Sequence, residues 1–403
     1  MAGNGFLHGV EVNEISNGLR PIEQVSSSII GIVGTAPGAD PMAFPLNTPV
    51  LVAGSRYEAA KLDVTEDGTG GGTLPPALDG IFDQIGATVV VIRVQEEIIE
   101  NDTLTNVIGG TDADTGQYLG IQALLSSKSV NGKVPRILCA PGFTHQKPVD
   151  GDGNPSANPV VAELIAIAER MSAIIVADGP NTNDDAAVQY GADFGSERVY
   201  VIDPWVKVFK AGETVIEPAS ARVAGVIAKT DYNIGFHQSP SNQPINGIIG
   251  TARAIDFELG DENSRANLLN EQKIATIIYE DGYRLWGNLS LSGDPKWKYL
   301  CVRRTADVIN DATKQSHFWA IDRGITTTLV SDVVEGINAE LRAMKNRGQI
   351  IGGSCWANAD LNTPESIQSG RLYIDYDFTP PYPNERMTFR SMLVNGYAVE
   401  VIV

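Results

Sequence analysis

Both ends of the chain alternate apolar and polar residues with the period of a β-strand. Residues 8–15 (HGVEVNEI) alternate Val10 and Val12 with polar neighbours. Residues 395–403 (NGYAVEVIV) place four apolar side chains on one side, namely Tyr397, Val399, Val401 and Val403. This period of two predicts a strand at each end. An apolar edge strand at a chain end invites pairing with another chain, so soluble proteins usually cover or blunt it.

We therefore expect the two ends to pair with neighbouring copies of the chain by strand addition. The residues predicted to take part in this inter-subunit strand exchange are Val10, Val12, Ile15, Tyr397, Val399, Val401 and Val403. If each copy lends strands to different neighbours, the contact is heterologous and propagates into a ring or a helix.

Between the ends, apolar runs alternate with amphipathic segments. Residues 27–36 and 87–94 are continuous apolar runs, typical of strands buried on both faces, with a short helix expected at 77–86. From about residue 133, strands are expected at 136–142, 173–180 and 197–208, and helices at 158–172, 183–194 and 218–231. Asn158 is a plausible N-cap, followed by Pro159 at the first helical position. Regular alternation of strand and helix predicts a parallel sheet, hence an α/β domain.

The last third of the chain has an α+β pattern. Long amphipathic helices are expected at 298–321 and 331–348, and β structure interrupted by prolines at 370–394. In the second helix, Asp332 and Glu335 have capping-box spacing and Gly348 suits the position after the C-cap. One apolar stripe runs along this helix, formed by Val333, Val334, Ile337, Leu341 and Met344.

Composition narrows the function classes. A chain of 403 residues exceeds one ordinary core, so two or three domains are expected. The net charge of −19 argues against phosphate or nucleic-acid binding, which needs clustered cations. The three cysteines lie far apart without CxxC or Cys/His spacing, so neither a disulfide scaffold nor a zinc site is predicted. No signal-peptide pattern opens the chain, and no apolar stretch of about 18 residues predicts a membrane helix.

The strongest enzyme candidates are two aspartates. Asp178 and Asp203 follow predicted strands, where open α/β sheets bind ligands. Turn residues follow both, however, and Asp in turns commonly caps its own backbone. The glycines of residues 31–38 match neither GxxxxGK[ST] nor GxGxxG, and the four histidines lie in different segments. We predict no catalytic, cofactor or metal site; an α/β nucleotide-binding enzyme using these residues is the alternative.

Several segments, taken in order, resemble one known family. They are residues 8–40 (HGVEVNEI…PGAD), 235–250 (GFHQSPSNQPINGIIG), 281–309 (DGYRLWGNLSLSGDPKWKYLCVRRTADVI), 318–353 (FWAIDRG…IIGG) and 370–389 (GRLYIDYDFTPPYPNERMTF). Their order and spacing resemble the contractile tail sheath proteins of bacteriophages, in the branch of temperate myophages and R-type pyocins. Residues 142–158 and 179–197 are the least typical.

The resemblance implies a structural protein, not an enzyme. Family sheaths stack as hexameric rings around an inner tail tube, and N- and C-terminal arms of neighbours complete a small sheet on another subunit. On triggering, the sheath shortens and drives the tube through the host envelope for genome delivery. The implied partners are the chain itself, the tail tube protein, and the baseplate and tail terminator proteins. The implied location is the virion, after assembly in the host cytoplasm. A tailocin or another contractile injection system remains an alternative.

The resemblance also implies a helix facing the tube and a division into domains. By position, residues 332–348 are the candidate helix, with Arg342, Lys345 and Arg347 as its contacts. Basic residues near a helix C-terminus are also stabilised by the macrodipole alone. The expected fold is a multi-domain combination of α/β and α+β. Its expected parts are an N-terminal β arm (1–20), the N-terminal part of a tube-proximal α+β domain (21–100), an outward-facing middle α/β domain (101–284), a tube-proximal C-terminal sheath domain (285–385) and a C-terminal β arm (386–403).

Overall fold

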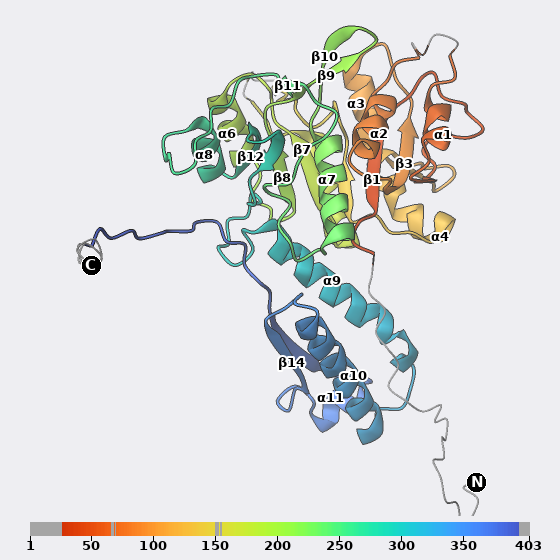
Figure 1. The fold of residues 1–403 in the computed structure, drawn as a ribbon. Coiled ribbons are helices and arrows are strands. Elements are labelled where there is room, and N and C mark those ends of the chain that lie inside the picture. Colours follow the sequence, from red (N-terminus) through yellow and green to blue (C-terminus); the bar gives the residue numbers. More distant parts are fainter. Residues whose placement is uncertain (1–25, 66–67, 69, 150–152, 154, 395–403) are drawn as a thin grey trace, which may run out of the picture.

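A computed structural model describes residues 26–394, except 66–67, 69, 150–152 and 154. Within this range the chain forms a large α/β domain and a smaller C-terminal lobe, with helix α9 (Leu300–Ser316) running from one to the other (Figure 1). None of the helices in the described part is long and apolar enough to span a membrane. The predicted α/β and α+β combination is confirmed.

The α/β domain is built on an eight-stranded sheet. The central strands are parallel, while β13 and β2 run antiparallel at the two edges. In spatial order the strands are β13 (Tyr283–Trp286), β12 (Ile274–Tyr279), β8 (Val199–Ile202), β7 (Ile174–Asp178), β6 (Ile137–Cys139), β1 (Ile30–Thr35), β3 (Thr88–Val94) and β2 (Val50–Ala53). Every residue of β1, β6, β7 and β8 is buried, and for β1 the continuous apolar run at 27–36 predicted this.

The sheet crosses the domain boundary that we expected between residues 100 and 101. Strand β1 lies between β3 and β6, with Ile30 opposite both Val89 and Ile137. The N-terminal strands and the middle strands therefore share one sheet and one pair of cores. This corrects the expected division: residues 21–100 do not belong to a domain separate from the middle one, because a strand hydrogen-bonded on both sides cannot be parted from its neighbours.

Helices cover both faces of this sheet (Figure 1). Helices α2 (Leu74–Phe82) and α7 (Ser220–Asn233) contribute to the core on one face, and α3 (Glu100–Ile108), α5 (Pro159–Met171), α6 (Asp184–Ala192) and α8 (Arg265–Glu271) to the core on the other. The predicted N-cap of α5 is confirmed, because the Asn158 side chain accepts a hydrogen bond from the backbone N–H of Val161.

Smaller elements decorate the α/β domain. The strand expected at 197–208 is two strands, because Pro204 lacks the N–H needed to continue a ladder. Its second half, β9 (Val206–Lys210), pairs with β10 (Glu213–Glu217) and β11 (Gly250–Thr251). The remaining elements are α1 (Arg56–Ala59), η1 (Ala60–Leu62), β4 (Gly110–Thr111), β5 (Tyr118–Leu119), η2 (Gly120–Ser126) and α4 (Ser127–Asn131).

In the C-terminal lobe, α10 (Thr327–Asn346) starts earlier than expected. Thr326 is the N-cap, and its side chain accepts a hydrogen bond from the backbone N–H of Leu329. The predicted capping box at Asp332 and Glu335 is therefore wrong. The apolar stripe extends back to Leu329, which is buried, and this favours the earlier start. The predicted C-terminal glycine is confirmed: Gly348 has φ +73° and its N–H donates to the carbonyl of Lys345.

The lobe contains a second, two-stranded sheet. Strand β15 (Ile374–Thr379) lies within the segment expected to be β structure, and it pairs antiparallel with β14 (Gly352–Ala357), which was not expected as a strand. Helix α11 (Pro364–Gln368) connects them, and η3 (Phe318–Ala320) follows α9. Residues 380–394 form no further strand; they leave the lobe, pass the junction of the two bodies and extend outward (Figure 1).

Candidate assembly surface

The two candidate catalytic aspartates lie at the carboxyl ends of β7 and β8, as predicted. The buried carboxylate of Asp178 accepts hydrogen bonds from the backbone N–H and the hydroxyl of Ser220, the first residue of α7. Burial raises the pKa of Asp178 to about 6, although the Ser220 hydrogen bonds oppose this rise. Asp178 therefore accepts from a backbone N–H at the start of α7, where the N-cap residue Ala219 offers no side-chain acceptor.

Asp203 is engaged in an ionic network. Arg253 lies 2.7 Å from one oxygen of Asp203, and the backbone N–H of Asn181 donates to the other at 2.8 Å. Arg253 and Arg265 both contact Asp184, at the start of α6. Burial raises the pKa of Asp203, and the opposite charge of Arg253 counteracts it. At this sheet edge the charged groups bind one another and hold the loops together.

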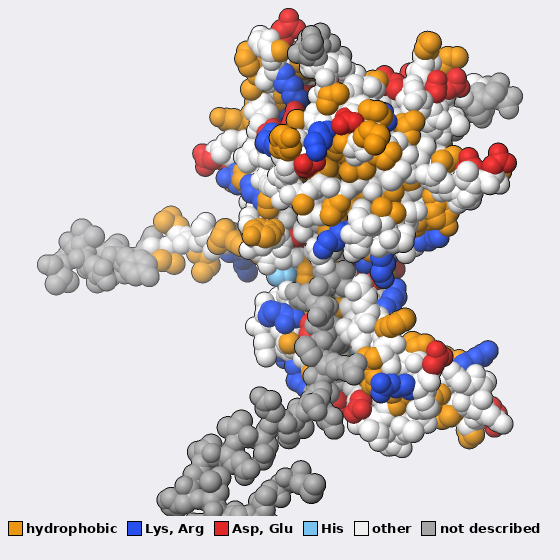
Figure 2. Space-filling view, turned by 90° about the vertical axis from the view of Figure 1, so that its right-hand side faces the viewer, with side chains coloured by type: hydrophobic (Ala, Val, Ile, Leu, Met, Phe, Trp, Pro, Cys, Tyr) orange, Lys and Arg blue, Asp and Glu red, His pale blue; other side chains and the backbone are white. Residues whose placement is uncertain are grey.

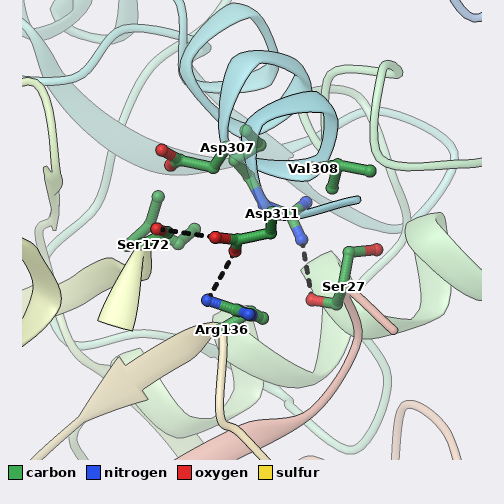
Figure 3. A pocket seen from close by; sticks show the side chains of 8 residues that line it. Ser27, Arg136, Ser172, Asp307, Val308 and Asp311 are labelled. Carbon is green, nitrogen blue, oxygen red and sulfur yellow. Dashed lines mark hydrogen bonds and ion pairs between the residues drawn. The ribbon is translucent and has the colours of Figure 1, made fainter. Parts of the chain in front are cut away.

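The two bodies meet through buried charged side chains of α9. Asp311 binds Arg136 at 2.8 Å and accepts the hydroxyl of Ser172 at 3.2 Å (Figure 3). One turn earlier, Asp307 binds Arg198 at 2.8 Å and Arg303 at 2.9 Å. All these ionic side chains are almost fully buried.

A third contact connects the residues just before β1 to α9. Arg304 binds Asp231 at the end of α7 and donates to the backbone carbonyl of Ser27, whose hydroxyl donates to Asp231 at 2.6 Å. Charge-assisted hydrogen bonds of this kind are directional, so together they fix the angle of α9 against the α/β domain. The sequence signal for this junction is a stripe of charges at four-residue spacing, Arg303, Asp307 and Asp311, on a helix that we expected only to be amphipathic.

The small sheet of the lobe is covered on one face only. Ile374, Tyr376 and Phe378 of β15 turn toward α9 and α10 and are half-buried, as partial members of the lobe core. Asp375 and Asp377 lie on the opposite face. Within the described residues, β15 pairs with β14 alone. The sheet is therefore a short, incomplete one with a partly open core.

The segment after β15 is exposed and apolar. Glu385 accepts a hydrogen bond from the hydroxyl of Tyr299 at 2.9 Å, and Arg386 lies 3.2 Å from Glu262. These two contacts attach the start of the segment to the body of the molecule. Beyond them large apolar side chains stand in solvent, with exposed fractions of 64% for Met387, 87% for Phe389, 82% for Met392 and 98% for Leu393. Figure 2 shows hydrophobic side chains along this segment, clear of the body. A projecting apolar strip marks an interaction site.

The three basic residues expected to face a tube lie in the last two turns of α10 or just after the helix. Arg342, Lys345 and Arg347 are all exposed. Arg342 lies 3.8 Å from Glu335, and Arg347 lies 2.6 Å from Glu340. Two of the three cations are therefore paired with acidic residues of the same helix.

The residues predicted for strand exchange, Val10, Val12, Ile15, Tyr397, Val399, Val401 and Val403, lie outside the described residues. The described part of the lobe ends in a two-stranded sheet, followed by an exposed segment that runs up to residue 394. Strand β14 was not predicted, because Gly352 and Gly353 weaken its strand pattern.

Comparisons with known proteins identify the family. The profile of the phage tail sheath protein central domain matches residues 116–291, and that of the phage tail sheath C-terminal domain matches residues 292–393. A prophage major tail sheath protein of Pseudomonas aeruginosa (strain UCBPP-PA14) is 40% identical over 98% of this chain and 99% of its own length. The chain belongs to the phage tail sheath family.

Other members and structures agree with this. The tail sheath protein of Escherichia phage P2 is 36% identical to this sheath protein over 98% of both chains. The anti-feeding prophage helical sheath in its contracted state has the same fold, with a TM-score of 0.68, 19% identity, and coverage of 96% of this chain and 99% of that chain. The protein is a structural subunit of a contractile tail sheath.

Proposed function

We propose that this sheath protein polymerises as stacked hexameric rings around an inner tail tube, and that contraction of the rings drives the tube through the host envelope for genome delivery. Its partners would be other copies of the chain, the tube protein, and the baseplate and terminator proteins. Assembly would take place in the host cytoplasm, and the subunit would act without enzymatic turnover. A tailocin or another contractile injection system would use the subunit in the same way.

The incomplete sheet of the lobe is the observation that carries this proposal. A pair of strands covered on one face only, beside a half-buried core, leaves backbone groups of β15 and apolar surface without partners among the described residues. The ends of the chain have the alternation that fits such an edge. Each added hydrogen bond contributes about 1 kcal/mol net, so one strand of several residues makes a firm link between subunits.

Contraction requires links that persist while the bodies move. The ionic junction on α9 holds the two bodies of one subunit in a fixed relation. Residues 384–394, by contrast, are exposed throughout and have no regular structure. We propose that each subunit moves as a rigid body while this segment changes direction, which is a hinge transition. The extended sheath would be held by a kinetic barrier and contract downhill.

For the tube, α10 is our candidate contact. Arg342, Lys345 and Arg347 are exposed, and Lys345 has no acidic partner within the described residues. An exposed cation on an otherwise acidic chain favours docking of an acidic surface. Lys345→Glu is expected to weaken co-sedimentation with purified tail tubes more than Arg347→Gln, whose charge is already paired. Equal binding of the two variants and the parent would remove α10 from the tube contact.

A truncation tests the assembly proposal. The full chain is expected to form long hollow tubes in negative-stain micrographs, and a chain lacking residues 394–403 is expected to stay a folded, soluble monomer. A matched pair sharpens the test: Val399→Asp places a charge on the apolar side of the predicted strand, whereas Glu400→Gln changes the other side and is expected to leave assembly intact. Normal tubes from the truncated chain would contradict strand exchange, and circular dichroism confirms that each variant is folded.

A further inference from the structure

The two ends of the described chain are fastened beside the start of one helix, α9. Toward the N-terminal end, Arg304 donates to the backbone carbonyl of Ser27 at 3.1 Å, and the Ser27 hydroxyl donates to Asp231 at 2.6 Å. Toward the C-terminal end, the hydroxyl of Tyr299, the N-cap of α9, donates to the carboxylate of Glu385 at 2.9 Å. Both fastenings therefore use residues 299–304.

The helix between these fastenings is firmly held. Residues 300–309 of α9 are all buried, so both bodies restrain this part of the helix. Five residues of an α-helix correspond to a rise of about 7.5 Å and a rotation of about 140°. Tyr299 and Arg304 therefore face different sides of a stiff element, and residues 380–394 pass its start before they extend outward (Figure 1).

The fastening toward the N-terminal end is a buried ion pair. The side chains of Arg304 and Asp231 are almost completely buried, and Arg304 binds both carboxylate oxygens of Asp231. Salt screens a buried pair only weakly, and loss of one partner would leave the other charge buried and unpaired. Arg304 and Asp231 therefore hold Ser27 against α9 for as long as the α/β domain is folded; we call this contact the clasp.

The fastening toward the C-terminal end is much more exposed. Glu385 accepts the Tyr299 hydroxyl, and Lys298 lies 3.9 Å from the same carboxylate, with both charged side chains partly exposed. The next ion pair along the segment, Arg386 with Glu262, is largely exposed. Exposed contacts of this kind each contribute little stability. The segment can therefore leave them without unfolding either body; we call the contacts of Tyr299 and Lys298 with Glu385 the latch.

We propose that the start of α9 anchors both ends of the chain, permanently through the clasp and releasably through the latch. A closed latch holds residues 384–394 in one direction, ready for a neighbouring copy, and an open latch lets them turn. A pull on the C-terminal segment then opens the latch before it disturbs α9. This inference rests on the proposed hinge and names the residues that control it.

Distances between pairs of spin labels in the free subunit test the latch. Thr388→Cys labels the C-terminal segment, Ser26→Cys labels the other end, and Lys133→Cys is an exposed reference on the α/β domain. The three native cysteines are buried, so the label is expected to spare them. The full-length subunits are kept dilute enough that light scattering detects no tubes, so each distance lies within one chain.

We expect one narrow distance from Lys133 to each of the other two labels in the parent chain. Tyr299→Phe removes the latch hydrogen bond and keeps the ring, so the ratio of latched to released subunits should fall about fivefold. Only the distance to Thr388 should broaden. A Thr388 distance that is already broad in the parent chain would overturn the latch.

Tyr382→Phe is the matched control for Tyr299→Phe. The ring of Tyr382 contacts the ring of Tyr299 edge to face, and its hydroxyl forms no hydrogen bond among the described residues. The control is therefore expected to keep the parental Thr388 distance. Identical distributions in Tyr299→Phe and Tyr382→Phe would show that the Tyr299 hydroxyl does not hold the segment.

Salt distinguishes the latch from the clasp without any substitution. Raising sodium chloride from about 0.1 M to 1 M shortens the screening length from about 10 Å to about 3 Å. The Thr388 distance is expected to broaden, because Lys298 and Glu385 are partly exposed, whereas the Ser26 distance should stay narrow. An equal response of the two distances, or a response of Ser26 alone, would overturn the division into a permanent and a releasable anchor.

A conservative substitution tests the clasp. Arg304→Lys keeps the charge opposite Asp231, but an ammonium group cannot reproduce the planar fork that binds both carboxylate oxygens and the Ser27 carbonyl. The Ser26 distance is expected to broaden while the Thr388 distance keeps its parental width. A thermal melt checks that the variant is folded. An unchanged Ser26 distance in the folded variant would show that β1 alone holds this end of the chain.

Electron microscopy separates failure of the latch from failure of the proposed assembly. Concentrated Tyr299→Phe subunits are expected to form tubes more slowly than Tyr382→Phe subunits, because a released segment must first find its direction. Equal rates would show that the latch does not prepare the segment for a neighbour. A parent chain that forms no tubes at all would contradict the proposed function, while the label distances would still decide whether the latch exists.

Discussion

The α/β domain and the C-terminal lobe finish their sheets in different ways. In the α/β domain, β1 has a strand on each side and every one of its residues is buried between two layers of helices. In the lobe, β15 has one partner among the described residues, and its core-facing side chains are half-buried. The central strands of the first body are paired on both sides, whereas within the described residues β15 of the second body is paired on one side.

The two bodies are joined differently again, because buried ion pairs of α9 connect them. Ion pairs are directional, so they restrict the angle of α9 against the α/β domain more than an apolar contact would. Their burial adds little net stability. Removing one partner is costly, however, because the other charge stays buried and unpaired. The junction is therefore where a single substitution should affect both bodies at once.

The largest effect is expected at Asp307. Asp307→Ala would leave Arg198 and Arg303 buried without their carboxylate and lower the free energy of unfolding by about 3–5 kcal/mol. Lys314→Ala is the control on the same helix, because its side chain is 70% exposed and its ion pair with Asp311 is loose. Differential scanning calorimetry measures both. Equal stability of the two variants would show that the junction is not held by its charges.

Ionisation of Asp178 is expected to make the stability of the α/β domain, but not that of the lobe, depend on pH. Burial raises the pKa of Asp178 from 3.8 to about 6, so the folded α/β domain is progressively penalised as pH rises from about 4 to 6 and carries the full penalty above that. Asp178→Asn removes the charge; its amide oxygen can still accept from the Ser220 N–H, and its NH₂ group can donate to the Ser220 hydroxyl oxygen in place of accepting from it. It is expected to stabilise the α/β domain at pH 8 by on the order of 3 kcal/mol, and not at pH 4.

The melting transition of the lobe should be unaffected by Asp178→Asn at either pH, because Asp178 lies in the other body. A constant difference between variant and parent at pH 4 and pH 8 would show that ionisation of Asp178 has no part in stability. Thermal unfolding followed at several pH values distinguishes these results.

A pair of phenylalanines compares the two cores directly. Phe44 is 2% exposed in the α/β domain, so Phe44→Ala is expected to cost about 3–5 kcal/mol. Phe378 is half-buried, and Phe378→Ala is expected to cost the free subunit about 1–2 kcal/mol. In assembled tubes the effect of Phe378→Ala should grow, because an added strand covers the ring. Chemical denaturation of subunits and of tubes measures this; an unchanged cost in tubes would contradict the idea of an incomplete core.

Prediction from sequence succeeded where the signal is local. The apolar runs at 27–36 and 87–94 gave β1 and β3, and Asn158 with Pro159 marked the start of α5, because strand period and helix caps depend on residues a few positions apart. The expected break at residue 100 was wrong, since sheet order joins segments that are far apart in the chain. The capping box at Asp332 was wrong because Thr326 supplied an equally good cap earlier.

The sequence alone determined the class of the fold, the apolar alternation of the two chain ends and the family. Only the tertiary structure decided which edges stay open and how the bodies are joined. No periodic pattern in the sequence predicts the ion pair of Arg136 with Asp311. The same holds for the two hydrogen bonds between the side chain of Asn338 and the backbone of Cys355. Each depends on the geometry of two segments brought together by folding, so its partners are defined only once the chain has packed.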